Sequence, residues 1–323
     1  MTASKSYPRS TVTMVPTCLK RAMVLLVAFG MMAHCQRMEE DLVAEETDIL
    51  EAQALDSPAV AAYWTTVGGT YIIRMSVGRC GVWVVNIYYS VFYRSNTYDS
   101  PKSLGDAWLG VPNDKLLKIR QVSVGYSTVW AINQYYGVYY REGITASKPR
   151  GDKWVKLSDN TKIKWITVTQ KGHVWGLSSS QKVMYREGAS NTNIAGTEWK
   201  TVSGVLLDTI TAGKSGVWGL NYGLTRKVWY REGTYGDPET NTVGSKWTDV
   251  QGVFNYICAG DDKVYGANYT SEIFYRNGMT AASPVGSNWG QTETGVNGLY
   301  HVAYVKDVLW AIDYSYTVRA KVF

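Results

Sequence analysis

The sequence predicts an all-β fold, a six-bladed β-propeller made of four-stranded antiparallel blades. Three observations predict it. Short runs rich in Val, Ile, Tyr and Trp alternate with Gly, Asn and Ser turns, as β-strands do. A Tyr-Arg-Glu-Gly motif recurs at nearly constant spacing, and two tryptophan motifs keep that spacing. A period of roughly 40–50 residues with several short strands per unit is typical of propeller blades.

The first repeated element is the arginine motif, which reads "VYYREG" at 138–143, "VMYREG" at 183–188 and "VWYREG" at 228–233. Looser copies are "VFYRSN" at 91–96 and "IFYRNG" at 273–278. The steps between the arginines are 47, 45, 45 and 45 residues. These arginines are Arg94, Arg141, Arg186, Arg231 and Arg276.

Two tryptophan motifs mark the same units. One opens each unit and supplies Trp64, Trp108, Trp154, Trp199, Trp247 and Trp289. The other, of the form "GVWGLN", supplies Trp83, Trp130, Trp175, Trp218, Tyr265 and Trp310. Eleven of the 13 tryptophans therefore occupy repeat positions. Large aromatic side chains at fixed strand positions are expected to build the core between blades.

The unit that begins near Trp199 shows the four strands. We expect strands at "EWKTVSG" (198–204), "LLDTITAG" (206–213), "GVWGLN" (216–221) and "KVWYRE" (227–232). A long, variable loop follows the arginine motif and ends in a glycine shortly before the next tryptophan. Pairing of the first strand, near Trp64, with the last, "TVRAKVF", is expected to close the ring and protect its sheet edges.

The segments before the repeats have a different composition. Residues 1–35 are predicted to be a secretory signal peptide, because Lys20 and Arg21 precede an apolar run and a small-residue site ends at Cys35. The alternative is a buried helix. Residues 36–57 are predicted to be an acidic leader or linker, with one plausible helix at 39–54. The repeats occupy residues 58–323, and no other segment is apolar enough to span a membrane.

The charge is unevenly distributed. The total is +6; residues 1–35 carry +4 and residues 36–57 carry −7, which leaves +9 on the repeat domain. A basic domain fits nucleic acid or an anionic glycolipid surface. If the signal is removed, Cys80 and Cys258 remain, in units that a six-unit ring does not place side by side. Two separate buried thiols are then expected, and not a disulfide.

Together these motifs resemble the tectonin β-propeller family, and the pattern is similar to that of fish-egg lectins and the horseshoe-crab lectin tachylectin-1. The matching pattern is W-x₂-V-x-G, I-x-V/A-G, G-V-W-G-x-N and V/I-x-Y-R-x-G over residues 58–323. The resemblance implies a secreted lectin that binds GlcNAc-type sugars or bacterial lipopolysaccharide and agglutinates or opsonises microbes. The last unit departs from it, with "TVRAKVF" in place of the arginine motif.

Candidate sugar-binding residues recur in each unit. A sugar site needs an aromatic platform and a few fixed hydrogen-bonding groups. The residues that end the "GVWGLN" strands offer amide or carboxylate groups, and the arginines offer planar donors. The candidates are Asn86, Asn133, Asn221, Asp313, Arg94, Arg141, Arg186, Arg231 and Arg276. The alternative is structural: Asx turns for the former, and pairing with acids or stacking on tryptophan for the arginines.

Catalysis and metal binding find little support. His173 and His301 lie in different units, and no catalytic motif accompanies them, so we expect a protein that is not an enzyme and has no cofactor. Loop carboxylates in "DPET" (237–240) and "GDD" (260–262) leave calcium as a possibility. Asn268, in the sequon Asn-Tyr-Thr, is a predicted glycosylation site.

Two classes of function remain. The first is a multivalent lectin of innate defence whose partners are microbial or egg-surface glycans, including lipopolysaccharide, and not nucleic acid. Several weak sites on one rigid ring would gain avidity on a repetitive surface. The second is a secreted scaffold that binds a protein partner, because the fold alone does not decide function.

Overall fold

The computed structural model describes residues 64–69, 71–112, 117–223, 225–292 and 298–323. Contacts divide the chain into two units, Met1–Ala61 and Ala62–Phe323. The predicted signal peptide, acidic leader and 39–54 helix lie outside the described residues. Every regular element that is described is a β-strand, which confirms the all-β prediction, and no helix among these residues is long and apolar enough to cross a membrane.

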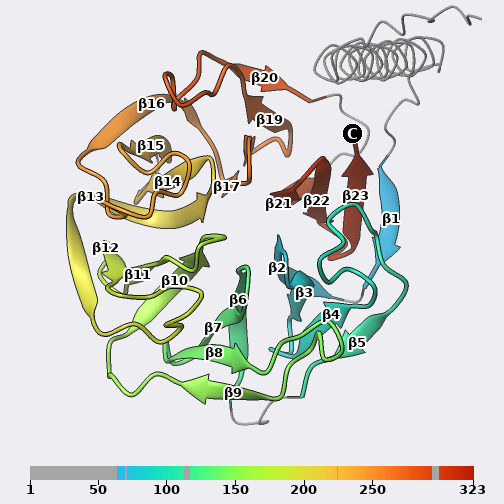
Figure 1. Cartoon of the computed structure of the whole chain (residues 1–323). Coiled ribbons are helices and arrows are strands. Elements are labelled where there is room, and N and C mark those ends of the chain that lie inside the picture. The colour runs from blue at the N-terminus through green and yellow to red at the C-terminus, as the bar shows by residue number, and fades with distance from the viewer. Residues whose placement is uncertain (1–63, 70, 113–116, 224, 293–297) are drawn as a thin grey trace, which may run out of the picture. The chain divides into compact units, whose positions relative to one another are not determined.

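The strands form antiparallel sheets arranged around a centre, as in a β-propeller (Figure 1). The first sheet contains β2 (Ile72–Gly78), β3 (Gly81–Asn86), β4 (Val91–Arg94) and β5 (Trp108–Gly110). The second contains β6 (Ile119–Val124), β7 (Val129–Asn133), β8 (Val138–Glu142) and β9 (Lys153–Lys156).

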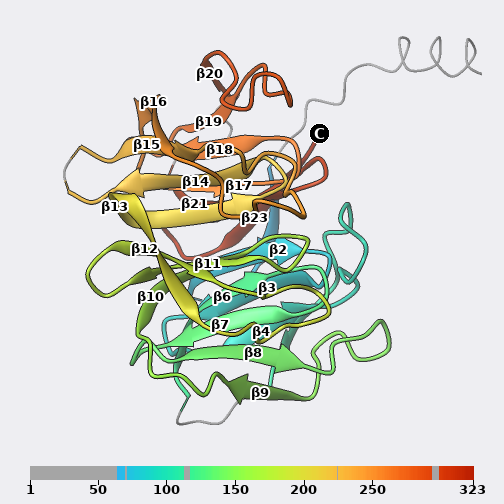
Figure 2. The same ribbon diagram turned by 60° about the vertical axis from the view of Figure 1, so that its left-hand side comes forward.

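A seven-stranded sheet follows. Its strands are β10 (Ile163–Val168), β11 (Val174–Ser178), β12 (Lys182–Arg186), β13 (Trp199–Gly213), β14 (Gly216–Asn221), β15 (Lys227–Arg231) and β16 (Trp247–Val253). The 15-residue strand β13 pairs with β12 through its first half and with β14 through its second half. Figure 2 shows β13 running between these two groups of strands. The predicted strands at 198–204 and 206–213 are therefore one strand.

Two further sheets complete the arrangement. One contains β17 (Tyr256–Ala259), β18 (Val264–Ala267), β19 (Ile273–Arg276) and β20 (Trp289–Gln291). The other contains β1 (Thr65–Gly68), β23 (Val318–Val322), β22 (Val308–Asp313) and β21 (Leu299–Val305). The pairing of β1 with β23 confirms the predicted joining of the two ends of the repeat array.

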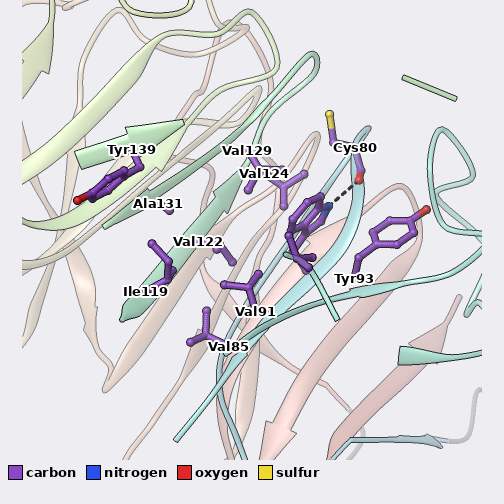
Figure 3. Packing of buried hydrophobic residues seen from close by; sticks show 12 residues of the cluster. Cys80, Val85, Val91, Tyr93, Ile119, Val122, Val124, Val129, Ala131 and Tyr139 are labelled. Carbon is purple, nitrogen blue, oxygen red and sulfur yellow. Dashed lines mark hydrogen bonds between the residues drawn. The ribbon is translucent and has the colours of Figure 1, made fainter. Parts of the chain in front are cut away.

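Aromatic and aliphatic side chains fill the space between neighbouring sheets. Trp83 is fully buried between the first and second sheets, and its indole N–H donates to the Cys80 carbonyl at 2.8 Å. Val85 and Val91 of the first sheet and Val122 of the second belong to the same buried cluster (Figure 3). The equivalent tryptophans Trp130, Trp175, Trp218 and Trp310 are also buried, as predicted. Cys80 and Cys258 are separate free thiols, which confirms that they do not pair.

The innermost strands are linked from sheet to sheet by one repeated hydrogen bond. The backbone N–H of Val124 donates to Ser76 Oγ, and that of Val168 donates to Ser123 Oγ, both at 2.9 Å. Thr167 and Thr211 accept in the same way at the next two junctions. At the junction between β21 and β2, where Ala303 has no hydroxyl, His301 Nε2 instead donates to the Met75 carbonyl at 2.8 Å.

Candidate functional site

The arginine motif clamps the long loop that follows it. Arg141 Nε donates to the Arg150 carbonyl at 2.7 Å, and Arg231 Nε donates to the Val243 carbonyl at 2.9 Å. The equivalent bonds join Arg94 to Leu104, Arg186 to Ala195 and Arg276 to Val285. Each accepting residue precedes a glycine with φ between 56° and 67°, a conformation that side chains resist.

Each guanidinium also lies over the tryptophan of the paired strand, 5.2–5.7 Å from the ring centroid. All five arginines are buried, and Arg141 is only 1% exposed. Burial lowers the pKa of Arg141 to about 10. The geometry therefore gives the five arginines a structural role, and their contact with sugar stays a prediction. Arg231 alone of the five also lines a described groove of about 350 Å³, beside Tyr185 and Thr242.

The predicted Asn and Asp residues build turns. Asn133 Oδ1 accepts from the backbone N–H groups of Tyr135 at 3.0 Å and Gly137 at 2.8 Å. Asp313 Oδ1 accepts from Ser315 and Thr317 in the same way. Asn86 makes the equivalent turn, and Asn221 Oδ1 accepts from the backbone N–H of Lys227. Asn86, Asn133 and Asp313 thus form the Asx turns of the structural alternative, and Asn221 closes a longer turn. A sugar contact through these side chains stays a prediction.

The same turns present exposed tyrosines that the sequence analysis missed. Each follows the Asx residue by one or two positions, and five of the six turns carry one. They are Tyr88 (62% exposed), Tyr135 (62%), Tyr222 (58%), Tyr269 (77%) and Tyr314 (61%). The signal was present in "NIYYS", "NQYYG", "NYGLT", "NYTSE" and "DYSYT". We call this set the turn tyrosines.

A cavity of about 780 Å³ opens at the axis on the same side as these turns. Its wall is built by a repeated irregularity, a register shift of one residue. The shift lies near the start of four innermost strands, and in β13 it lies where the strand begins to pair with β14. The extra residues are Ile73, Arg120, Lys164, Asp208 and Tyr300, and all five line the cavity. A β-bulge re-aims a side chain that a regular strand would direct elsewhere.

The cavity combines cations with aromatic rings. Its four cations are Arg74, Arg120, Lys164 and Arg226, and Asp208 is the one acid among the described lining residues. Its aromatic residues are Tyr136, Trp165, Tyr256, Tyr300, Tyr314 and Tyr316. We call this the axial cavity. It holds none of the residues that the sequence analysis selected, because the bulged position carries a different residue type in each of the five strands.

The opposite mouth of the axis has a different character. Its cavity, of about 720 Å³, mixes both charges, with Arg79, Lys171 and Lys306 near Asp99 and Asp262. Between the two mouths the axis narrows to a space of about 70 Å³. The mixture of paired charges gives this end no preference for one sign of ligand.

His173 and His301 each make a buried structural hydrogen bond. His173 Nδ1 lies 2.7 Å from Asp237 Oδ1, and both residues are buried. His301 is buried at the junction described above, and burial, with Arg74 nearby, lowers its pKa to about 3. Across the part of the chain that the structure describes, no three His, Cys, Asp or Glu side chains are grouped to hold a metal ion.

Asn268 lies in an exposed turn, where its side chain is hydrogen-bonded. Its Oδ1 accepts from Thr270 and Glu272 backbone N–H groups, and its Nδ2 donates to Glu272 Oε2 at 2.7 Å. Glycosylation of Asn268 stays a prediction. It would require release of that last bond and would cover the neighbouring turn tyrosine, Tyr269.

The repeated sheets define a β-propeller built from tectonin-type repeats. A family model described as the tectonin domain matches residues 43–168 and 158–314, so the chain belongs to the tectonin family. A relative is the Perivitellin-2 31 kDa subunit of Pomacea maculata, 29% identical over 261 residues, which cover 74% of this chain and 80% of that protein.

Solved structures share the fold at low sequence identity. A gluconolactonase from Xanthomonas campestris has a TM-score of 0.56 at 6% identity, over 84% of this chain and 93% of that chain. A protein of unknown function from Bacteroides thetaiotaomicron has a TM-score of 0.52 at 12% identity, over 81% and 76%. At these identities the likeness concerns the fold alone.

Proposed function

We propose that this chain is a secreted, multivalent lectin of innate defence that binds GlcNAc-type sugars or bacterial lipopolysaccharide. The observation that carries the proposal is the set of turn tyrosines, repeated on one face of a rigid ring. A tyrosine ring offers an apolar platform with a polar tip, which suits the face and hydroxyls of a pyranose. Repetition supplies the multivalency, because several weak sites gain avidity on a repetitive surface.

We infer six blades for this propeller. The count follows if the two halves of β13 belong to different blades, β10–β13 and β13–β16. Five turn tyrosines on six blades then leave one blade without a platform, because Ser180 stands at that position. Up to five equivalent sugar sites per chain are the consequence.

The proposal is of binding without catalysis. Both histidines of the repeat domain are buried in structural contacts, which supports a non-enzymatic role. Secretion rests on the predicted signal peptide at 1–35. Agglutination or opsonisation would follow if one ring bridges two surfaces or marks one.

A glycan array with the secreted protein tests the sugar preference. We expect GlcNAc-terminated glycans and lipopolysaccharide cores to bind, and Tyr88→Ala and Tyr135→Ala to weaken agglutination more than soluble-sugar binding. The matched control is Tyr126→Ala, since Tyr126 is 45% exposed but lies in a β6–β7 turn at the other end of the strands. No glycan binding by the wild-type protein, or equal losses in all three variants, would reject the proposal.

A second candidate function is a scaffold for a protein partner. The observation that favours it is the name of the relative, which describes that protein as a subunit. Retention of the chain on a column by a protein partner, with no elution by free GlcNAc, would favour the scaffold. Elution by the sugar would favour the lectin.

A further inference from the structure

The axial cavity differs from the turn tyrosines in number and charge. There is one such cavity at the axis, and its lining carries four cations against one acid, a net charge of +3. Asp208 already forms two ion pairs, because its Oδ2 lies 3.0 Å from Arg226 Nη2 and its Oδ1 lies 3.5 Å from Lys164 Nζ. A ligand that enters this cavity therefore meets positive charge in excess.

Two of the cations have no acidic partner within the described residues. Arg74 and Arg120 form no ion pair there, and each stacks on an aromatic ring. The Arg74 guanidinium is 5.5 Å from the Trp165 ring centroid, and that of Arg120 is 5.3 Å from the ring of Tyr136. Stacking fixes a guanidinium plane while N–H groups on its edge stay available to an anionic acceptor. Arg74 uses one of these groups already, because its Nη1 donates to the Ile73 carbonyl at 2.8 Å. The two arginines come from neighbouring innermost strands, β2 and β6 (Figure 1).

Two tyrosines with a left-handed backbone lie at the rim of the same cavity. Tyr136 has φ of 65° and Tyr316 has φ of 60°, both in the left-handed region that favours glycine or asparagine. The equivalent turn residues Tyr89, Gln181 and Ser271 share this conformation, so it belongs to the repeated turn. At Tyr136 and Tyr316 the turn places a ring at the rim of the cavity. Both rings line the axial cavity, and Tyr300 and Tyr314 stack beside them with their planes 6° apart.

The size and wall of the cavity fit a sugar-sized molecule. Its volume of about 780 Å³ lies within the usual range of small-molecule sites, roughly 300–1,000 Å³. Aromatic walls suit the faces of a pyranose, and the arginine edges suit a carboxylate or phosphate oxygen pair. Neutral sugars would use only the first of these features.

We propose that the axial cavity is a single binding site for an anionic sugar, a pyranose that carries a phosphate or a carboxylate, distinct from the repeated sites on the turns. Arg74 and Arg120 bind the anionic group, and the tyrosines at the rim stack on the ring. Asp208 weakens this site by neutralising two of the other cations. The site shares Tyr314 with the turn tyrosines. It goes beyond the proposed function, since it does not depend on the other four.

Calorimetric titration of the full chain with three probes tests this site: glucose 6-phosphate, the methyl glycoside of N-acetylneuraminic acid, and neutral GlcNAc. We expect one site per chain for at least one anionic probe, at least tenfold tighter than any neutral-sugar binding at the axis. The stronger of the two anionic probes identifies the source of the charge. Equal binding of charged and neutral probes would overturn the proposal.

Three variants locate the site. Arg120→Gln should weaken anionic binding about tenfold, and Asp208→Asn should strengthen it severalfold. Tyr136→Gly should weaken anionic binding while the melting temperature holds or rises, because glycine relieves the strained backbone. Arg79→Gln, at the opposite mouth, is the control and should change nothing.

The axial site and the lectin sites on the turns can be tested independently of each other. Tyr88 lies outside the axial cavity, so Tyr88→Ala should leave the anionic titration unchanged. Anionic binding that persists unchanged in both Arg120→Gln and Asp208→Asn would place the anion elsewhere and refute the axial site, whatever the glycan array shows.

Discussion

At the scale of single residues, Arg141 shows why the arginine motif repeats. Its side chain donates to the carbonyls of Arg150 at 2.7 Å, Pro112 at 3.0 Å and Gly151 at 3.4 Å while it covers the ring of Trp154. One side chain therefore joins a strand, its loop and a preceding segment. The repeated Tyr-Arg-Glu-Gly is explained by this clamp without any ligand.

We expect Arg141→Ala to destabilise the domain by about 2–3 kcal/mol, because it leaves buried carbonyls without donors. In a domain of this size that corresponds to a fall of roughly 4–12 °C in melting temperature. Arg150→Ala is the control, since that side chain is exposed and its backbone carbonyl remains. An unchanged melting temperature together with lost sugar binding would instead make Arg141 a ligand residue.

His301 should make stability depend on pH. Its folded pKa of about 3 lies below the ordinary value of 6.5, so below pH 6.5 the unfolded chain takes up a proton that the folded chain does not. The unfolding free energy should fall by about 1.4 kcal/mol per pH unit from this residue, or roughly 2–3 kcal/mol at pH 4.5. The loss continues until pH approaches 3.

Urea unfolding at pH 7.5 and pH 4.5 measures this effect. His301→Gln keeps a donor for the Met75 carbonyl but does not titrate, so its loss of stability between the two pH values should be smaller than that of the wild type. Equal losses in both proteins would show that His301 is not the responsible group.

At the scale of elements, the β7–β8 turn contains one residue that stabilises the turn and one that is exposed to a ligand. Asn133 holds the turn through two backbone hydrogen bonds, whereas the Tyr135 ring is 62% exposed. Asn133→Ala should therefore lower stability by about 1 kcal/mol, and Tyr135→Ala should leave it within about 0.5 kcal/mol. Thermal melts and binding to immobilised GlcNAc distinguish the two. Stable Asn133→Ala with lost binding would reverse these roles.

Elements and motifs were largely predictable from the sequence, and the site was not. The recurrence of the tryptophans and arginines predicted the repeated strands, and the alternation of apolar residues predicted their positions. The continuity of β13 was hidden, because Gly204 reads as a strand end. Its φ of 114° is open to glycine, and the chain passes through it from one sheet partner to the next. The axial cavity was hidden because bulges aim Arg120 and Lys164 into it, and the bulged position carries a different residue type from unit to unit.

At the scale of the whole molecule, closure depends on β1 and β23. Deletion of residues 316–323 removes β23 and leaves the edges of β1 and β22 unpaired. We expect loss of the cooperative melting transition of the entire domain. Phe323→Ala, which shortens only the exposed last side chain, is the control. A deletion variant that melts like the wild type would contradict closure by these strands.

The net positive charge of the repeat region should also strengthen binding to anionic bacterial surfaces. The repeat region carries +9 by the count above. At 0.15 M, salt largely screens interactions between exposed charges that are more than about 8 Å apart. Binding to lipopolysaccharide-bearing bacteria should weaken as salt rises from low to high concentration. Binding to neutral GlcNAc beads should barely change. Salt-independent binding to bacteria would remove the role of the positive charge.

The central claim is that one rigid ring carries several sugar sites on its turn tyrosines. Native mass spectrometry with a GlcNAc oligomer counts them directly. We predict more than one and up to five bound oligomers per chain, with the maximum reduced by one in each of Tyr88→Ala, Tyr135→Ala and Tyr222→Ala. A maximum of zero or one, or a maximum that these substitutions leave unchanged, would contradict the account.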